Sequence, residues 1–205
     1  MSGVANVSGQ AMPNAPADST AGHPTTLTEA FISAFRHHPS GVAIITADSG
    51  GGPVALTVSS LISVSASPPT VAFSLSASSS TAKAVEEAET VVVHFVRRAD
   101  MELARLCATR GVDRFGPEVR WDRLGSGEPY YPQVDLWFRA ALRGRLLVPG
   151  ACLVTAELLA VSPFDQEPHT ESALVYANRT WHKLGPVTGV NKAPLLLWPE
   201  DSPTF

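Results

Sequence analysis

The chain has 205 residues, of which 44% are hydrophobic, enough for one domain of ordinary size with a closed core. Its net charge is −4, and its 15 Lys and Arg residues are dispersed without a basic stripe, which argues against nucleic acid as a partner. No apolar run reaches the roughly 18 to 20 residues of a membrane helix, and residues 1–24 lack the basic start and apolar core of a signal peptide, so we expect neither membrane insertion nor export.

The first segment, residues 1–24, consists largely of Gly, Ala, Ser, Pro and Asn. With almost no large apolar side chains, such a segment cannot offset its own ordering entropy. We expect a disordered leader that serves as a spacer. A strap that folds over a dimer partner is the alternative.

A helix is predicted over residues 25–38, and Pro39 ends it. Thr26 or Thr28 is available as its N-cap. An apolar stripe at helical spacing is formed by Leu27, Phe31, Ile32 and Phe35. The helix is therefore expected to be amphipathic.

After Pro39 the pattern changes to that of short strands. Gly50–Pro53 and Pro68-Pro69 separate them as turn signals. The strands are expected at 41–47, 54–57, 61–65 and 70–75. Short strands at this spacing are typical of an antiparallel barrel or sandwich.

Helices and strands alternate in the second half of the chain. Helices are expected at 81–89 and 99–108, with a strand between them, at 90–96, that is buried on both faces. Two long strands, 136–148 and 152–161, flank Pro149-Gly150 and predict a hairpin. A last pair of strands is expected at 173–176 and 180–184, and residues 186–205 are expected to pack on the barrel or on a dimer partner.

Hydroxyl side chains are concentrated in two segments. The first, Thr57–Pro69, reads TVSSLISVSASPP, and its hydroxyls along a strand edge can meet the polar rim of a planar ring. The second, Ser78–Thr81, enters a predicted helix, where free N–H groups and the helix dipole attract phosphate and where plain capping is the alternative. Together the two segments indicate a nucleotide-like ligand.

In their order along the chain, these segments resemble the flavin reductase domain family, the FMN-binding split-barrel proteins that act as reductase components of two-component monooxygenases. The matching segments are FRHHPSGVAIITA at 35–47, TVSSLISVSASPP at 57–69, SST at 79–81, DRF at 113–115, AEL at 156–158 and LVYANRTWHKL at 174–184. The resemblance implies a mainly β split barrel with a few helices over residues 25–185. It also implies a homodimer.

The resemblance carries over a flavin site, residue by residue. The isoalloxazine and ribityl contacts correspond to Thr57, Val58, Ser59, Ser60 and Ser63. The phosphate contacts correspond to Ser79, Ser80 and Thr81. FMN or FAD is the implied cofactor and NADH or NADPH the implied co-substrate. The implied activity is that of an NAD(P)H:flavin oxidoreductase that supplies reduced flavin to a partner monooxygenase in secondary or aromatic metabolism.

One position departs from the family pattern. The family's G-D-H turn places a histidine beside the flavin and the nicotinamide, whereas this chain has Gly150 and Ala151 there. His182 is therefore the candidate catalytic residue, and Trp181 is a candidate stacking wall of the cofactor site. Two alternatives stay open: a flavin-binding carrier or accessory protein without nicotinamide activity, and a flavoenzyme acting directly on an aromatic or polyketide-like metabolite.

The remaining reactive residues predict no other chemistry. Cys107 and Cys152 are too few for a disulfide framework, so we expect a reducing, cytoplasmic compartment. His37, His38 and His94 lack metal-ligand spacing with Cys or Asp, and no metal site is predicted.

Overall fold

The computed structural model describes residues 26–163 and 173–184, apart from the side chain of Ser80. The expectations for the leader at 1–24 and for the extension at 186–205 lie outside the described residues. The chain divides into two units, Met1–Phe35 and Arg36–Phe205.

Helix α1 (Leu27–His37) begins as the sequence predicts. The Thr26 hydroxyl accepts a hydrogen bond from the Glu29 N–H at 3.2 Å, and the Thr26 N–H donates to the Glu29 carboxylate at 3.0 Å. This reciprocal pair is a capping box, and it identifies Thr26 as the N-cap. No residue of α1 is buried, so its apolar stripe is exposed.

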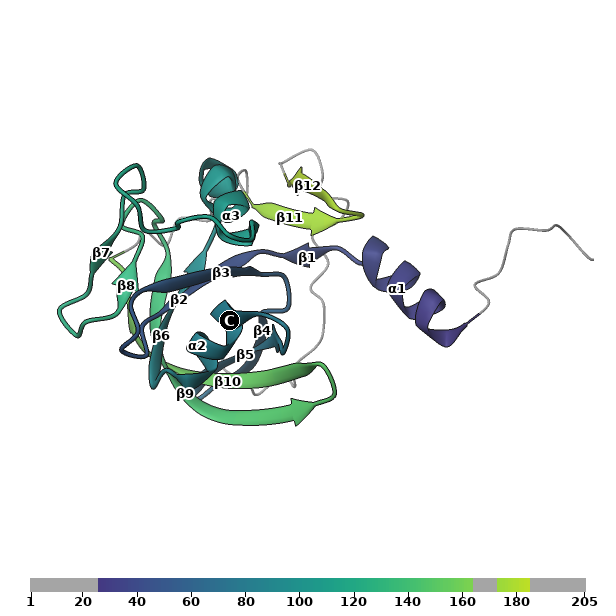
Figure 1. The fold of residues 1–205 in the computed structure, drawn as a ribbon, viewed down its shortest axis with the longest axis horizontal. Coiled ribbons are helices and arrows are strands. Elements are labelled where there is room, and N and C mark those ends of the chain that lie inside the picture. Colours follow the sequence, from purple (N-terminus) through teal and green to yellow (C-terminus); the bar gives the residue numbers. More distant parts are fainter. Residues whose placement is uncertain (1–25, 164–172, 185–205) are drawn as a thin grey trace, which may run out of the picture. The chain divides into compact units, whose positions relative to one another are not determined.

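A seven-stranded antiparallel sheet in the order β3-β2-β6-β9-β10-β5-β4 forms the second unit. Its strands are β2 (Ala43–Ala47), β3 (Val54–Val58), β4 (Ile62–Ala66), β5 (Pro69–Ser76), β6 (Thr90–Phe95), β9 (Trp137–Val148) and β10 (Ala151–Val161). Figure 1 shows the sheet curling around α2 (Ser80–Glu87), with β3 and β4 as its two ends. The mainly β split barrel with a few helices confirms the predicted fold class.

Smaller elements complete the unit. They are β1 (Ser40–Gly41), the turn of 3₁₀ helix η1 (Arg98–Asp100), α3 (Met101–Ala108), β7 (Asp122–Arg123), β8 (Pro129–Tyr130), β11 (Leu174–Ala177) and β12 (Thr180–Lys183). The strand predicted at 41–47 is divided, because Ser40 and Gly41 pair with β11 whereas Ala43–Ala47 pair within the barrel. Strands β7 and β8 were not predicted.

The β9–β10 and β11–β12 hairpins have two-residue turns that contain residues of positive φ. Val148 pairs with Ala151 across Pro149-Gly150, and Gly150 has a φ of +86°, so the predicted hairpin is confirmed. Asn178 and Arg179, between β11 and β12, have φ values of +48° and +58°, the requirement of a type I′ turn.

Strands β2 and β6 separate two apolar layers. Alternate residues, such as Ile45 and Val93, face the barrel interior, where α2 contributes Val85. The intervening Ile44 packs outside the barrel. The outer layer also contains Val42, Ala104, Cys107, Tyr131, Val134 and Leu174. Burial of the 90–96 strand on both faces, as predicted, is confirmed.

His94 joins three segments inside this outer layer. Its Nδ1 lies 3.2 Å from the carbonyl oxygen of Ile44, and its Nε2 accepts a hydrogen bond from the Tyr131 N–H at 3.1 Å. Burial lowers the pKa of His94 to about 4, despite the bond to Ile44. A neutral His94, protonated on Nδ1, therefore connects β6, β2 and the segment after β8.

Glu128 anchors the β7–β8 segment to the barrel wall. Its carboxylate accepts hydrogen bonds from Thr90 at 2.6 Å, from the Arg139 Nε–H at 2.7 Å and from Ser126. Burial raises the pKa of this carboxyl, but the bonds from Ser126, Thr90 and Arg139 outweigh burial and lower it to about 2.

None of the helices in the described ranges is long and apolar enough to cross a membrane.

Replacement of Glu128 is expected to reduce stability with a defined pH signature. Because the folded pKa of about 2 lies below the ordinary 4.5, ionised Glu128 stabilises the fold above pH 4.5, and this contribution is lost as the pH falls toward 2. We expect this contribution to be about 3 kcal/mol. Glu128→Gln should lower the free energy of unfolding at neutral pH by about 2 to 3 kcal/mol and remove this part of the acid sensitivity, as measured by urea unfolding.

Glu157→Gln is the matched control, because Glu157 forms a 2.7 Å ion pair with Arg143 that is largely exposed. Its effect should stay below about 1 kcal/mol. Equal losses for the two variants would contradict an anchoring role for Glu128.

Candidate functional site

A cavity of about 470 Å³, which we call the barrel-end cavity, opens between β3, the start of α2 and the end of α3. The structure brings together here most of the residues expected to bind a cofactor. Those that line the cavity are Thr57, Val58, Ser59, Ser60, Ser79 and Thr81.

The hydroxyls of Thr57 and Ser60 already donate within the protein. Thr57 Oγ1 donates to the Ala104 carbonyl at 2.7 Å and so ties β3 to α3. Ser60 Oγ accepts from the Ser74 N–H at 2.9 Å and donates to the Ser74 carbonyl at 3.3 Å. Because each O–H bond is used, these oxygens can serve a ligand only as acceptors, for example toward a ring N–H. Ser59 is exposed to the cavity.

The start of α2 provides an anion-binding end to the same cavity. Ser79 is the N-cap, and its Oγ accepts from the Ala82 N–H at 3.2 Å, so capping, the alternative left by the sequence, is what its side chain does. The half-buried Thr81 lies in the first turn of the helix. The N–H groups and the dipole of this first turn favour a negatively charged group.

Two arginines, Arg110 and Arg114, also line the barrel-end cavity. The sequence did not identify either of them as a site residue. Arg114 donates from Nε to the Cys107 carbonyl at 3.3 Å and from Nη2 to the Thr109 carbonyl at 2.5 Å. It therefore neutralises the negative C-terminal end of α3, which would otherwise oppose an anion in the cavity. Arg110 is exposed and, among the described residues, has no ion-pair partner, so its charge is available to a ligand. Arg114 lies in the DRF segment, which resembles the family pattern but was given no role from the sequence.

Gly150 and Ala151 also line the barrel-end cavity. The Ala77 N–H donates to the Gly150 carbonyl at 3.0 Å, which holds the hairpin turn beside the loop that precedes α2. A methyl group thus faces the cavity at the position where the family pattern has an imidazole. Among the described residues that line the cavity there is no histidine.

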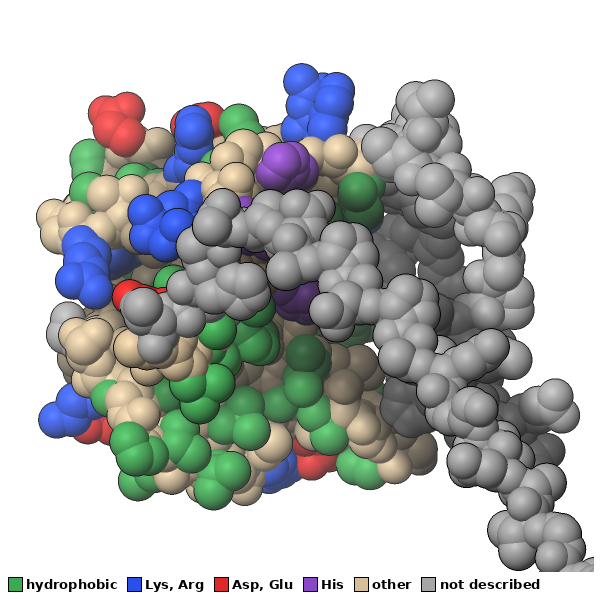
Figure 2. Space-filling model, turned by 90° about the vertical axis from the view of Figure 1, so that its right-hand side faces the viewer, with side chains coloured by type: hydrophobic (Ala, Val, Ile, Leu, Met, Phe, Trp, Pro, Cys, Tyr) green, Lys and Arg blue, Asp and Glu red, His purple; other side chains and the backbone are tan. Residues whose placement is uncertain are grey.

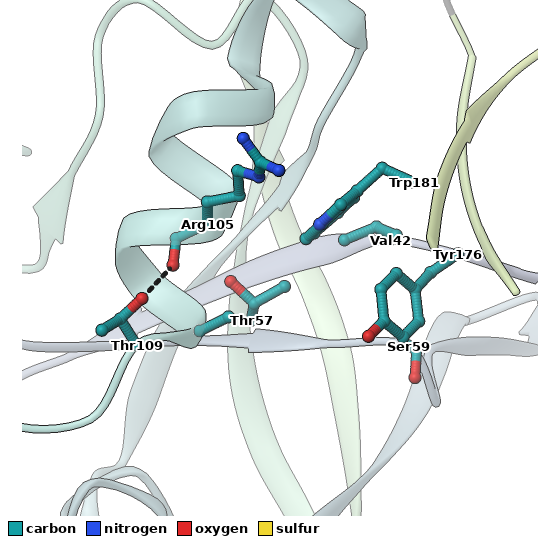
Figure 3. Close-up of a pocket in the computed structure, with 8 residues that line it drawn as sticks. Val42, Thr57, Ser59, Arg105, Thr109, Tyr176 and Trp181 are labelled. Atoms are coloured by element: carbon teal, nitrogen blue, oxygen red, sulfur yellow. Dashed lines mark hydrogen bonds between the residues drawn. The ribbon is translucent and has the colours of Figure 1, made fainter. Parts of the chain in front are cut away.

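A second cavity of about 530 Å³, the Trp181 cleft, lies beside the first and shares Thr57, Ser59 and Ala108 with it. Figure 3 shows Trp181 and Tyr176 on the side of the β11–β12 hairpin and Arg105 on the side of α3, with Thr57 between them. The two aromatic rings are a direct cross-strand pair with centroids 5.1 Å apart and an angle of 64°. Trp181 therefore lines a cleft next to the barrel-end cavity.

Ser63 and His182 are not among the described residues that line either cavity. Ser63 is exposed on β4. His182 is exposed on β12, with Nε2 at 3.3 Å from the Ala177 carbonyl oxygen, and side chains alternate along a strand, so it faces away from Trp181. The catalytic role of His182 stays a prediction, and the geometry of the cavities gives it no support. Ser80 is the first residue of α2.

Comparison with known proteins identifies one family. Residues 35–185 match the family described as flavin reductase like domain. The NADH:FMN oxidoreductase of Rhodococcus erythropolis is 31% identical over 157 residues, which are 77% of this chain and 82% of the relative. The stachydrine N-demethylase reductase subunit of Rhizobium meliloti is 32% identical over 114 residues, 55% of this chain and 49% of that protein. The crystal structure of a flavin reductase domain protein from Arthrobacter sp. FB24 superposes with a TM-score of 0.72 at 27% identity, covering 80% of this chain and all of that one.

The bond from Thr57 to Ala104 should be detectable as stability in the ligand-free protein. Thr57→Val keeps the shape of the side chain but removes one of the donors to the Ala104 carbonyl, which retains its bond within α3, so the free energy of unfolding should fall by about 1 kcal/mol. Thr57→Ser, the matched control, retains the hydroxyl and should keep most of that stability. Urea unfolding without flavin measures both, and equal losses would refute the link between β3 and α3.

Proposed function

Because the chain belongs to the flavin reductase like domain family, we propose that it is an NAD(P)H:flavin oxidoreductase that supplies reduced flavin to a partner monooxygenase. The oxidoreductase and reductase-subunit names of its relatives support the activity and the partner. FMN or FAD is the proposed flavin, and NADH or NADPH is the proposed electron donor.

The observation that carries the proposal is the chemistry of the barrel-end cavity. Acceptor hydroxyls line it at Thr57 and Ser60, the N-terminus of α2 lines it at Ser79 and Thr81, and Arg110, which has no ion-pair partner among the described residues, lines it just after α3. A phosphorylated flavin fits this set, because it joins a ring that carries an N–H group to an anion. We propose that Thr57–Ser60 contact the ring and the ribityl chain, and that Ser79, Ser80, Thr81 and Arg110 contact the phosphate.

When bound, the flavin supplies the hydride-accepting chemistry, and the chain binds and orients it. Thr57 and Ser60 are held by their bonds to Ala104 and Ser74, so they present fixed acceptors to the ring. Arg114 keeps the end of α3 from repelling the phosphate.

A second candidate function follows from Ala151. Since no imidazole is among the described residues that line the barrel-end cavity, the second candidate is a carrier or accessory protein that binds flavin without efficient use of a nicotinamide. The other alternative uses the same space for an aromatic or polyketide-like metabolite that the flavin oxidises directly.

An anaerobic absorbance titration with NADH and with NADPH distinguishes these functions. Bleaching of the bound flavin by either nicotinamide supports the reductase. Yellow protein that neither nicotinamide bleaches would exclude the reductase and leave the carrier and the direct flavoenzyme. Protein that takes up neither FMN nor FAD would overturn all three.

We also propose that the protein is a homodimer in the cytoplasm. The β9–β10 hairpin carries consecutive exposed apolar residues at its tip, Leu146, Leu147 and Val148, and Figure 2 shows hydrophobic side chains gathered on the lower part of this face. An apolar patch of this kind marks a protein interface. Cys107 and Cys152 are both unpaired and buried, which fits a reducing compartment.

Removal of the charge at Arg110 should weaken FMN binding selectively. Arg110→Ala is expected to raise the dissociation constant for FMN about tenfold, because a charge-assisted contact with the phosphate is lost, and to leave riboflavin affinity nearly unchanged. Arg98→Ala, at an exposed arginine of η1, is the matched control. Equal weakening of FMN and riboflavin, measured by calorimetry, would place the phosphate elsewhere.

A charge at the hairpin tip should dissociate the dimer. Leu147 is 72% exposed, so Leu147→Glu should leave the monomer folded while it buries a carboxylate in the proposed interface. Light scattering should then report half the wild-type mass. Leu159→Glu, at an exposed residue farther along β10, is the control and should remain dimeric. An unchanged mass for Leu147→Glu would exclude the hairpin tip as the interface.

A further inference from the structure

The two cavities meet along one border, and a reductase needs two neighbouring sites. Thr57 and Ser59 at the end of β3 and Ala108 at the end of α3 belong to both. The groups suited to a flavin phosphate, at the start of α2, line only the barrel-end cavity. A flavin that extends from there along Thr57–Ser60 has its ring at the shared border. A nicotinamide that contacts such a ring at the border has the adjoining Trp181 cleft open to the rest of its dinucleotide.

The Trp181 cleft has the chemistry of a nucleotide site. The Tyr176 ring meets the Trp181 indole edge-on, and the tight Asn178-Arg179 turn holds their two strands in register, so the half-buried indole is a fixed stacking surface. Indole stacks well on planar bases of any sequence. The volume of about 530 Å³ is in the range of small-molecule sites.

Arg105 adds a cation to the opposite wall. Its only described ion pair, with Glu102 at 3.4 Å, is between two exposed side chains, and such pairs contribute little. Its guanidinium can therefore turn to a phosphate at small cost. Thr109 donates to the Arg105 carbonyl from its N–H at 3.1 Å and from its hydroxyl at 2.9 Å, so this carbonyl near the end of α3 is already hydrogen-bonded and opposes an anion less.

We propose that the Trp181 cleft binds the adenosine diphosphate half of the nicotinamide dinucleotide, with adenine on Trp181 and the diphosphate at Arg105. The proposal rests on the proposed reductase function. It assigns Trp181 to the electron donor instead of the flavin, and it makes the β11–β12 hairpin the part of the fold that selects a dinucleotide over a nicotinamide mononucleotide.

The first test is direct binding of ADP-ribose to the full chain saturated with FMN, by calorimetry. Trp181→Ala should weaken ADP-ribose about tenfold, and Trp181→Phe should retain most of the affinity because it keeps an aromatic face. Arg105→Ala should weaken ADP-ribose but not adenosine, whereas Arg98→Ala should leave both unchanged. Unchanged FMN affinity of each variant shows that the site is folded.

The second test compares NADH with reduced nicotinamide mononucleotide, which lacks the adenosine half. Trp181→Ala should raise the KM for NADH about tenfold with little change in kcat, and it should leave the KM for the mononucleotide unchanged. Weaker FMN binding with unchanged ADP-ribose binding would overturn the proposal and assign the cleft to the flavin. Equal effects on both donors, or no effect on either ligand, would also overturn it.

The reductase function and the assignment of the Trp181 cleft are refuted by different results. Flavin bleaching by NADH together with ADP-ribose binding that ignores Trp181 and Arg105 would refute the cleft assignment and leave the reductase. ADP-ribose binding that depends on Trp181, in a protein whose flavin no nicotinamide bleaches, would support the cleft as a nucleotide site and refute the reductase.

Discussion

Every side chain of β2 is buried, so the barrel wall requires apolar cover on its outer face as well as inside. Ile45 is covered by the barrel core, and Ile44 by the layer that contains α3, Tyr131 and Leu174. Because α3 must lie on this outer face, it packs beside β3, where Thr57 bonds to its Ala104 carbonyl and where its C-terminal end borders the cavities. Both cavities form at that junction, so the position of the site follows from burial of one strand on two sides.

Local patterns made much of this fold predictable. The Thr26 cap, the Pro149-Gly150 turn and the doubly buried β6 each depend on residues a few positions apart, and the structure has all three. The break after Gly41 was not predictable, because it depends on pairing with Tyr176 and Val175, more than a hundred residues away. Strands β7 and β8 are only two residues each, too short for a sequence pattern, and Glu128 is held by Thr90 and Arg139, which lie 38 and 11 residues away on other strands.

The candidate site divides in the same way. Hydroxyl residues that stand next to one another in sequence, such as Ser59 and Ser60, were found from the sequence because their segment carries a recognisable pattern. Arg110 and Arg114 were not assigned a role, since their value depends on where the end of α3 lies in space. Trp181 was predicted from the sequence to be an aromatic wall of the cofactor site. Only the fold shows that it lines a separate cleft next to the barrel-end cavity.

The internal bonds of Thr57, Ser60, Ser79 and Arg114 have a further consequence for ligand exchange. The hydroxyls and the guanidinium of these residues each make at least one hydrogen bond within the protein, and the one buried side-chain polar atom without a hydrogen bond among the described residues, Gln133 Oε1, is in neither cavity. When a ligand leaves, these side chains therefore keep their hydrogen bonds within the protein, and the ligand-free protein does not lose the stability that these bonds provide. Such a pocket suits a molecule that arrives, reacts and diffuses away, and it does not require one that is held for the lifetime of the protein.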